Sequence, residues 1–225
     1  MVYKYYSPQQ YNFDALQNGY FFFCKVSKLN DPFDTNLKLL QGLPQEYADH
    51  AILTVREYAT CSFSRRADNL SLWALYAQSY TGFAVGYDET MFEDLIRKYS
   101  FRFIFHDVFY VDAPLDVSNP ETAFPSWNYE GEHRMVRLKE CINDQRKRDA
   151  LYIYMAFMKE AKVWANEEEY RAFVGKDILK YGAGKEGIRF EDNGYKVDMP
   201  KGTIKSIIIG HNMCNENRQL LLTQV

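Results

Sequence analysis

The sequence contains few cysteines and no recognisable cysteine motif. Its four cysteines are Cys24, Cys61, Cys141 and Cys214, and they lie far apart in the 225 residues without a C-x-x-C pair. Zinc ribbons and dithiol redox motifs need closely spaced pairs, so neither is expected. Scattered cysteines are typical of a protein with reduced thiols, and we expect a cytoplasmic location.

Long apolar runs, a basic excess and nucleotide-binding signatures are also missing. No apolar stretch approaches the roughly 18 residues that cross a membrane, so no membrane partner is predicted. The 27 basic and 30 acidic residues give a net charge of −3, which argues against bulk binding to nucleic acid. P-loop, G-x-G-x-x-G, G-x-S-x-G and H-E-x-x-H motifs do not occur. The four histidines are far apart, and no metal site is predicted.

Aromatic residues, in contrast, are abundant. The chain has 3 Trp, 18 Tyr and 16 Phe, within a hydrophobic share of 47% that excludes a disordered protein. Aromatic side chains bury large areas, so they build either a ring-rich core or the walls of a ligand cleft.

The pattern of strands and helices is mixed, without strict βαβ alternation. Asp192-Asn193-Gly194 predicts a hairpin turn between two short strands. The spacing of apolar residues predicts a helix over residues 144–163, and three prolines favour a long loop over residues 112–134. Together these elements predict one α+β domain over residues 1–225, with a mixed, mostly antiparallel sheet flanked by helices.

Three acids, Glu167, Glu168 and Glu169, precede a predicted strand. Alternate side chains of a strand share a face, so Glu167 and Glu169 would lie together if the strand begins early. Arg171 would follow on that face and would hold a carboxylate through paired hydrogen bonds. The alternative is a solvated charged connection, which is the usual role of a charge run.

Two further clusters carry polar side chains. Asn30, Asp31 and Asp34 surround a proline on a rigid turn that suits a ligand hydroxyl or an ion, although such turns also form simply because Asn and Asp cap their own backbone. The strand end Cys61-Ser62-Phe63-Ser64 precedes a helix containing Trp73 and Tyr76. This pair of elements would form one wall of a pocket for a flat ring, or only pack the helix on the core.

These clusters belong to a series of short motifs that follow one another along nearly the whole chain. The motifs are Tyr3-Lys4-Tyr5, Asn18 to Phe23, Leu29 to Asp34, Cys61 to Ser64, Leu72 to Ala77, Gly82 to Tyr87, and Trp164 to Arg171. In this order the chain resembles the bacterial family catalogued as domain of unknown function 2971, from residue 3 to about residue 210. That resemblance implies no particular activity.

More distantly, the layout is similar to ADP-ribosyltransferase-like domains, whose split antiparallel α+β fold binds NAD in a cleft. The resemblance places three sets of residues in that cleft: Lys4 or Tyr5 on an early strand, Ser62 or Ser64 near Tyr76 on a middle strand, and Glu169 or Glu167 on a late strand. It implies that the glutamate stabilises an oxocarbenium-like centre when the nicotinamide–ribose bond breaks. Trp73 or Tyr76 would stack on nicotinamide, and Trp164 and Arg171 would contribute to binding.

Three functions follow as hypotheses. The first is a bacterial enzyme that consumes NAD, a transferase or a glycohydrolase, with a role in toxicity or phage defence. The second is a module that binds a nucleotide or peptide in the same cleft without turnover. The third is a nucleic-acid hydrolase in which Asp31, Asp34 and the glutamates hold Mg²⁺, an ion that prefers carboxylate ligands.

Overall fold

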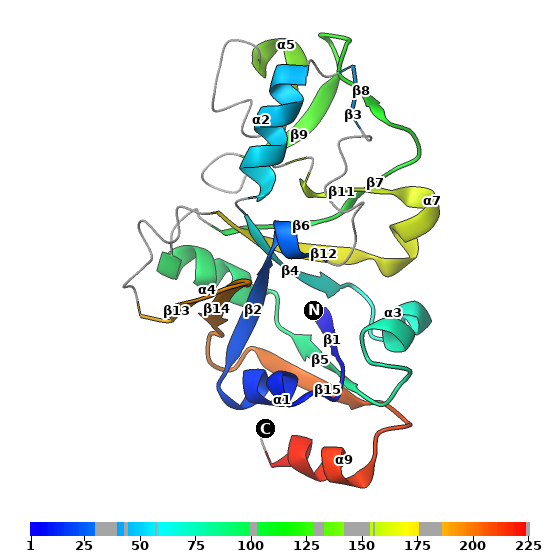
Figure 1. Cartoon of the computed structure of the whole chain (residues 1–225), viewed down its shortest axis with the longest axis vertical. Helices are drawn as coiled ribbons and strands as arrows, with labels where there is room; N and C mark the ends of the chain where they lie inside the picture. The colour runs from blue at the N-terminus through cyan, green and yellow to red at the C-terminus, as the bar shows by residue number, and fades with distance from the viewer. Residues whose placement is uncertain are drawn as a thin grey trace.

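The computed structural model describes residues 1–29, 40–42, 45–56, 58–99, 103–127, 133–141, 154, 156–175 and 186–223. The fold is α+β, with a large antiparallel sheet and helices around it, as the sequence predicts (Figure 1). No helix within these residues is long and apolar enough to cross a membrane.

One large sheet organises the molecule. Its strands are β1 (Val2–Tyr6), β2 (Tyr20–Lys25), β4 (Ala59–Ser64), β5 (Phe83–Tyr87), β6 (Phe103–Asp107), β12 (Glu169–Val174), β13 (Ile188–Glu191), β14 (Gly194–Asp198) and β15 (Ile204–Ile209). They follow the order β13-β14-β2-β4-β1-β5-β15, while β12 joins β4 and β6 joins β12. All of these pairs are antiparallel.

Three small sheets and several helices complete the fold. The small sheets pair β3 (Leu40–Gln41) with β8 (Leu115–Asp116), β7 (Phe109–Val111) with β11 (Met158–Glu160), and β9 (Ala123–Trp127) with β10 (His133–Arg137). The helices are α1 (Gln10–Gln17), α2 (Gln45–Arg56), α3 (Leu70–Leu75), α4 (Thr90–Tyr99), α5 (Leu138–Cys141), α7 (Ala161–Trp164) and α9 (Asn215–Leu222), with 3-10 turns η1 (Val26–Lys28) and η3 (Ala165–Glu167). The first two small sheets are parallel, so the strand pairing is mixed, as predicted.

Strand β4 is the branch point of the large sheet. Strand β12 occupies one edge of β4 along its whole length, from Ser64 to Ala59. Strands β1 and β2 therefore share the other edge, β1 at Ser64 and β2 at Ala59 and Thr60. Between these two attachments, residues 61–63 have no strand partner on that edge within the described chain, and the sheet splits there (Figure 1).

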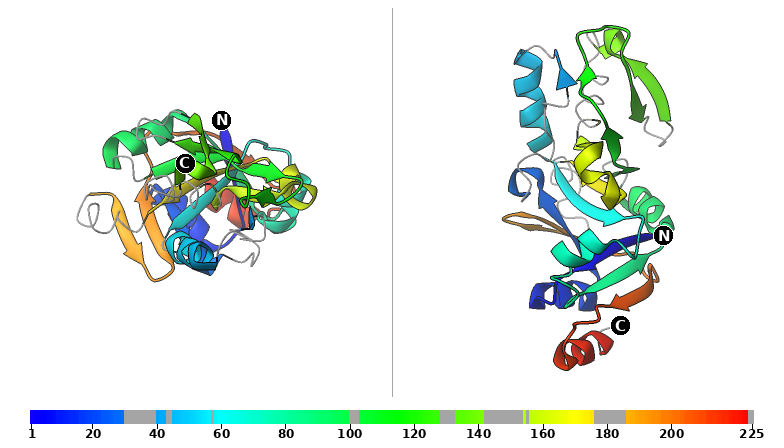
Figure 2. Two further views of the ribbon diagram at one scale, coloured as in Figure 1. Left: turned by 90° about the horizontal axis from the view of Figure 1, so that it is seen from above. Right: turned by 90° about the vertical axis from the view of Figure 1, so that its right-hand side faces the viewer.

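The two faces of β12 belong to different hydrophobic cores. Ala172 and Val174 pack into the larger core, which also takes in buried residues of α1 and α4. Phe173 points to the other face and joins a second core with Phe124 and Phe157. The second core lies with α2, β9 and β11 on the upper side of the large sheet (Figures 1 and 2). The abundant aromatic residues are therefore mostly core residues.

The hairpin prediction is confirmed, and two other local predictions are wrong. β13 and β14 pair from Ile188↔Val197 to Glu191↔Gly194, with Asp192 and Asn193 in the turn and Gly194 as the first residue of β14. Residues 158–160, predicted as helix, form β11, because they pair with β7 in parallel; most of the remaining predicted helix lies outside the described residues. The predicted loop over residues 112–134 contains β8 and β9 and the start of β10. β11 and β8 pair with the distant strands β7 and β3, which local periodicity does not report, whereas β9 and β10 pair with each other despite the prolines that favoured a loop.

Candidate functional site

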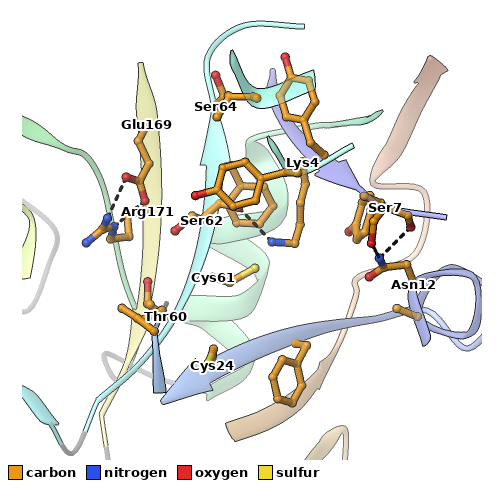
Figure 3. Close-up of a pocket in the computed structure, with 18 of the residues that line it drawn as sticks. Lys4, Ser7, Asn12, Cys24, Thr60, Cys61, Ser62, Ser64, Glu169 and Arg171 are labelled. Carbon is orange, nitrogen blue, oxygen red and sulfur yellow. Dashed lines mark hydrogen bonds and ion pairs between the residues drawn. The ribbon is translucent and has the colours of Figure 1, made fainter. Parts of the chain in front are cut away.

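A cleft of about 730 Å³ lies where β1 and β2 separate along β4 (Figure 3). Side chains of β1, β2, β4 and α1 line it together with residues from η3, β11 and β12. Ligand pockets commonly measure roughly 300–1,000 Å³, so the cleft has room for a nucleotide-sized molecule.

Lys4 of β1 extends into the split (Figure 3). Its Nζ donates a hydrogen bond to the carbonyl oxygen of Ser62 at 3.1 Å, on the β4 edge that lacks a strand partner. The ammonium also lies 5.5 Å from the ring centroid of Phe63. Burial raises the pKa of Cys24 and of Cys61, and the Lys4 charge partly offsets both shifts. Lys4 thus supplies a fixed positive charge in the middle of the cleft.

Alternation along β4 and β12 gathers polar side chains on one face. Ser64 stands opposite Glu169, and Ser62 stands opposite Arg171. Ser64 is buried and its hydroxyl donates to the carbonyl of Glu167 at 2.7 Å, whereas Ser62 is exposed to the cleft. Ser64 therefore holds the backbone of the site, and Ser62 is the hydroxyl that a ligand can reach.

Four charged side chains form a buried cluster along the cleft. Arg171 Nε donates to Glu169 Oε1 at 2.6 Å, and its second terminal nitrogen donates to Glu169 Oε2 at 2.8 Å. Lys159 Nζ lies 3.0 Å from Glu167 Oε2 and 2.7 Å from Glu169 Oε2, so it bridges the two acids. All four residues are less than 9% exposed. The predicted paired hydrogen bonds between Arg171 and a carboxylate are present.

A strained backbone at Glu168 brings the two acids to the same lysine. Strand β12 begins only at Glu169, so Glu167 does not belong to it, and strand alternation is not the reason that the two side chains meet. Instead Glu168 adopts the left-handed conformation, with φ 43° and ψ 52°. A non-glycine residue pays about 1–2 kcal/mol for this conformation. Such strain persists where the surrounding structure imposes it, which is common at functional sites.

The two acids have pKa values shifted in opposite directions. Burial opposes ionisation of Glu169, but the charges of Arg171 and then Lys159 outweigh it and lower its pKa to about 2. Burial raises the pKa of Glu167; Lys159 partly offsets this, and the negative charge of Glu169 reinforces it. Glu169 is therefore a permanent carboxylate, while Glu167 is the better proton carrier. Paired carboxylates with divergent pKa values are typical of acid–base sites.

The structure brings most of the predicted site residues to the cleft. Those that line it are Lys4, Tyr5, Ser62, Ser64, Tyr76, Glu167, Glu169 and Arg171. Tyr76 is 45% exposed, and the Tyr5 hydroxyl donates to the carbonyl of Arg66 at 2.8 Å. Asn30, Asp31 and Asp34 lie outside the described residues.

Two predicted aromatic residues do not line the cleft. Trp73 is 5% exposed and stacks on Tyr80 at 5.4 Å, with its indole nitrogen donating to the carbonyl of Ala67. Asn69 caps α3 through the backbone N–H of Leu72. Trp73 and Leu72 pack in one small core cluster, whereas Tyr76, directly after α3, is exposed and lines the cleft. Trp164 instead lies with its ring centroid 4.8 Å from Lys159 Nζ.

Lys159 is a charged residue of the candidate site that the sequence did not single out. Its only local signal is a lysine directly after the apolar Phe157-Met158, inside the segment predicted as helix. Its position follows from the parallel pairing of β11 with β7. Tyr110 of β7 adds a hydroxyl that accepts from the backbone N–H of Glu169 at 2.8 Å, and burial raises the pKa of this tyrosine to about 12.

No family model matches the chain, and neither a curated protein nor a solved structure is significantly similar to it. Among the described residues, no three His, Cys, Asp or Glu side chains are grouped as metal ligands.

Proposed function

We propose that the protein cleaves the N-glycosidic bond of a nicotinamide nucleotide such as NAD, as a glycohydrolase or an ADP-ribosyltransferase-like enzyme. The observation that carries this proposal is the buried pair Glu167 and Glu169 on the wall of the cleft, with pKa values shifted in opposite directions. The split antiparallel sheet with its cleft supports the same reading. The order of the sequence motifs further suggests kinship with the family catalogued as domain of unknown function 2971.

The two acids suit the two charges of this reaction. When the bond between ribose C1′ and the nicotinamide nitrogen breaks, the bonding pair leaves with the ring, which becomes neutral, and positive charge develops on the ribose. The permanent carboxylate of Glu169 stabilises that charge in a buried setting where electrostatic effects are strong. Glu167 takes the proton from the water or acceptor hydroxyl that attacks C1′. The products are nicotinamide, ADP-ribose or its adduct, and one proton.

Free nicotinamide released from NAD is the direct readout. Glu167→Gln removes the proton acceptor, and general base catalysis is worth about 10²–10⁴-fold, so a loss of that size in kcat is expected. Glu168→Gln is the matched control, because Glu168 does not line the cleft and its exposed side chain pairs with Arg66. The control should keep wild-type activity.

Each result has a defined meaning for the proposal. Wild-type protein that releases no nicotinamide, or a Glu167→Gln variant as active as wild type, would refute it. Glu169→Gln tests the second role: equal activity of wild type and this variant would remove Glu169 from the mechanism. Thermal unfolding of every variant confirms that the compared proteins are folded.

A second candidate function is nucleotide binding without turnover. It is favoured by the occupancy of Glu169, both of whose oxygens already accept from Arg171 or Lys159. A carboxylate whose two oxygens are both bound by protein side chains has a structural role in the wall of the cleft. Tight binding of NAD without any nicotinamide release is the outcome that selects this function over the enzyme.

A further inference from the structure

The cleft continues into a second hollow of about 360 Å³ on the side of β14. Asp14, Asn18, Tyr20, Arg189 and Lys196 line this hollow. Tyr20 and Lys196 also line the main cleft, so the two spaces meet at these side chains. A ligand in the cleft can therefore extend toward Arg189 without leaving the protein surface.

Two cations flank Tyr20 at this junction. Lys196 Nζ lies 5.0 Å from the ring centroid of Tyr20, and the Arg189 guanidinium carbon lies 5.8 Å from it. Glu191 and Asp198 position the cations: Lys196 Nζ is 2.8 Å from Glu191, and an Arg189 nitrogen is 2.7 Å from Asp198. The hydrogen bond to Glu191 raises the pKa of Lys196, so the lysine stays charged at neutral pH.

These acid pairs leave the cations able to bind an anion. An arginine carries five N–H donors and a lysine three, more than one carboxylate contact uses. The pairs are partly exposed, and exposed ion pairs are worth only about 0–1 kcal/mol, so a phosphate can share or replace the carboxylate. Arginine and lysine together are the usual partners of phosphate oxygens.

The two groups of charged side chains lie on different strands of the cleft. Glu167 and Glu169 lie beside β12, while Lys196 and Arg189 lie on β14 and β13, beyond β4 and β2 in the strand order. Three strand spacings separate the backbones of β14 and β12, about 14 Å. Both ends are ion-paired, because Lys159 and Arg171 hold the two acids while Glu191 and Asp198 hold Lys196 and Arg189. What distinguishes the second hollow is that its ion pairs are partly exposed, so a ligand can reach the cations there.

We propose that Arg189 and Lys196 form a phosphate subsite of the cleft, so that the ligand is a phosphorylated nucleotide whose phosphate binds beside Tyr20. The proposal rests on the proposed function for the identity of the ligand as a nucleotide. It adds the substrate class: nucleoside 5′-phosphate esters are bound, and the corresponding nucleosides are discriminated against.

Two probes that differ by one phosphate test the subsite. Nicotinamide mononucleotide and nicotinamide riboside are titrated calorimetrically into wild-type protein and into Glu167→Gln, in which turnover is blocked. The double variant Arg189→Gln/Lys196→Gln removes the cations. Lys205→Gln is the matched control, because Lys205 is an exposed, ion-paired lysine of β15 that lines neither space.

The mononucleotide should bind about 10-fold or more tightly than the riboside, as two charge-assisted contacts imply. This preference should fall below about 3-fold in the double variant, persist in Lys205→Gln, and weaken with added salt, which screens exposed charges. Inorganic phosphate should compete with the mononucleotide and not with the riboside.

Equal affinities for the two probes in wild-type protein overturn the subsite, as does an unchanged preference in the double variant. Failure of the proposed function looks different. In that case the preference for the mononucleotide remains and depends on Arg189 and Lys196, but no nicotinamide is released from either probe.

Discussion

Replacing Glu169 with glutamine should cost the fold several kcal/mol at neutral pH and almost nothing in strong acid. The pKa of Glu169 falls from an ordinary 4.5 to about 2 in the folded protein. One pKa unit is worth about 1.4 kcal/mol, so the ionised carboxylate contributes about 3 kcal/mol to the free energy of unfolding. Because Glu169 is only 5% exposed, solvent screens little of this contribution. Losses of about 3–5 kcal/mol are usual when one partner of a buried ion pair is removed.

The lowered pKa of Glu169 determines how the stability difference between wild type and Glu169→Gln changes with pH. A folded-state pKa below the unfolded value adds stability that is fully present above the unfolded pKa and is lost as pH falls through the folded one. Urea denaturation of wild type and Glu169→Gln between pH 7 and pH 2 should therefore show a gap of about 3 kcal/mol that closes between about pH 5 and pH 2. A gap that stays constant across this range would refute the ionisation argument.

Glu167→Gln, two residues from Glu169, serves as the matched control. Burial raises the pKa of Glu167, so its ionised form is disfavoured in the folded state. Stability from this group is present at low pH and is lost as pH rises through the folded pKa, the reverse of Glu169. Neutral glutamine should leave stability at pH 7 unchanged or increase it. Equal losses in both variants would show that the two acids do not have the opposed environments described above.

Two further predictions concern the frame of the site. Glu168→Gly relieves the strain of the left-handed backbone and should leave the unfolding free energy unchanged or raise it by up to about 1 kcal/mol, whereas Glu168→Val should lower it. Urea denaturation of both variants measures these changes. A valine variant as stable as wild type would contradict the strain at Glu168. Trp73→Ala should lose about 3–5 kcal/mol of stability, as truncation of buried aromatic residues does, while Tyr76→Ala, at an exposed position lining the cleft, should weaken nucleotide binding with little loss of stability. A binding loss in Trp73→Ala and a stability loss in Tyr76→Ala would instead place Trp73 against the ligand.

The contact between Glu169 and Arg171 was predictable because it is nearly local, whereas the meeting of Glu167 with Glu169 depends on the left-handed backbone at Glu168, which alternation does not predict. Glu169 and Arg171 are two residues apart on one strand, so alternation alone puts them on one face. Lys159 was not predictable, since its place depends on β11 pairing with β7, about fifty residues earlier in the chain. Trp73 was misplaced for a similar reason: a helix shows two faces, and only the packing against Tyr5 and Tyr80 decides which one is buried.

The branching of the large sheet at β4 also bears on how the protein folds. The contacts that shape the cleft join distant segments: Lys4 to Ser62 spans 58 residues, Ser64 to Glu167 spans 103, and Thr60 to Ala172 spans 112. Proteins dominated by such separations fold slowly, because loop closure is paid before the contacts form. During synthesis, one edge of β4 has no partner until β12 has emerged from the ribosome, and the cleft is complete only after Lys196 of β14 has followed.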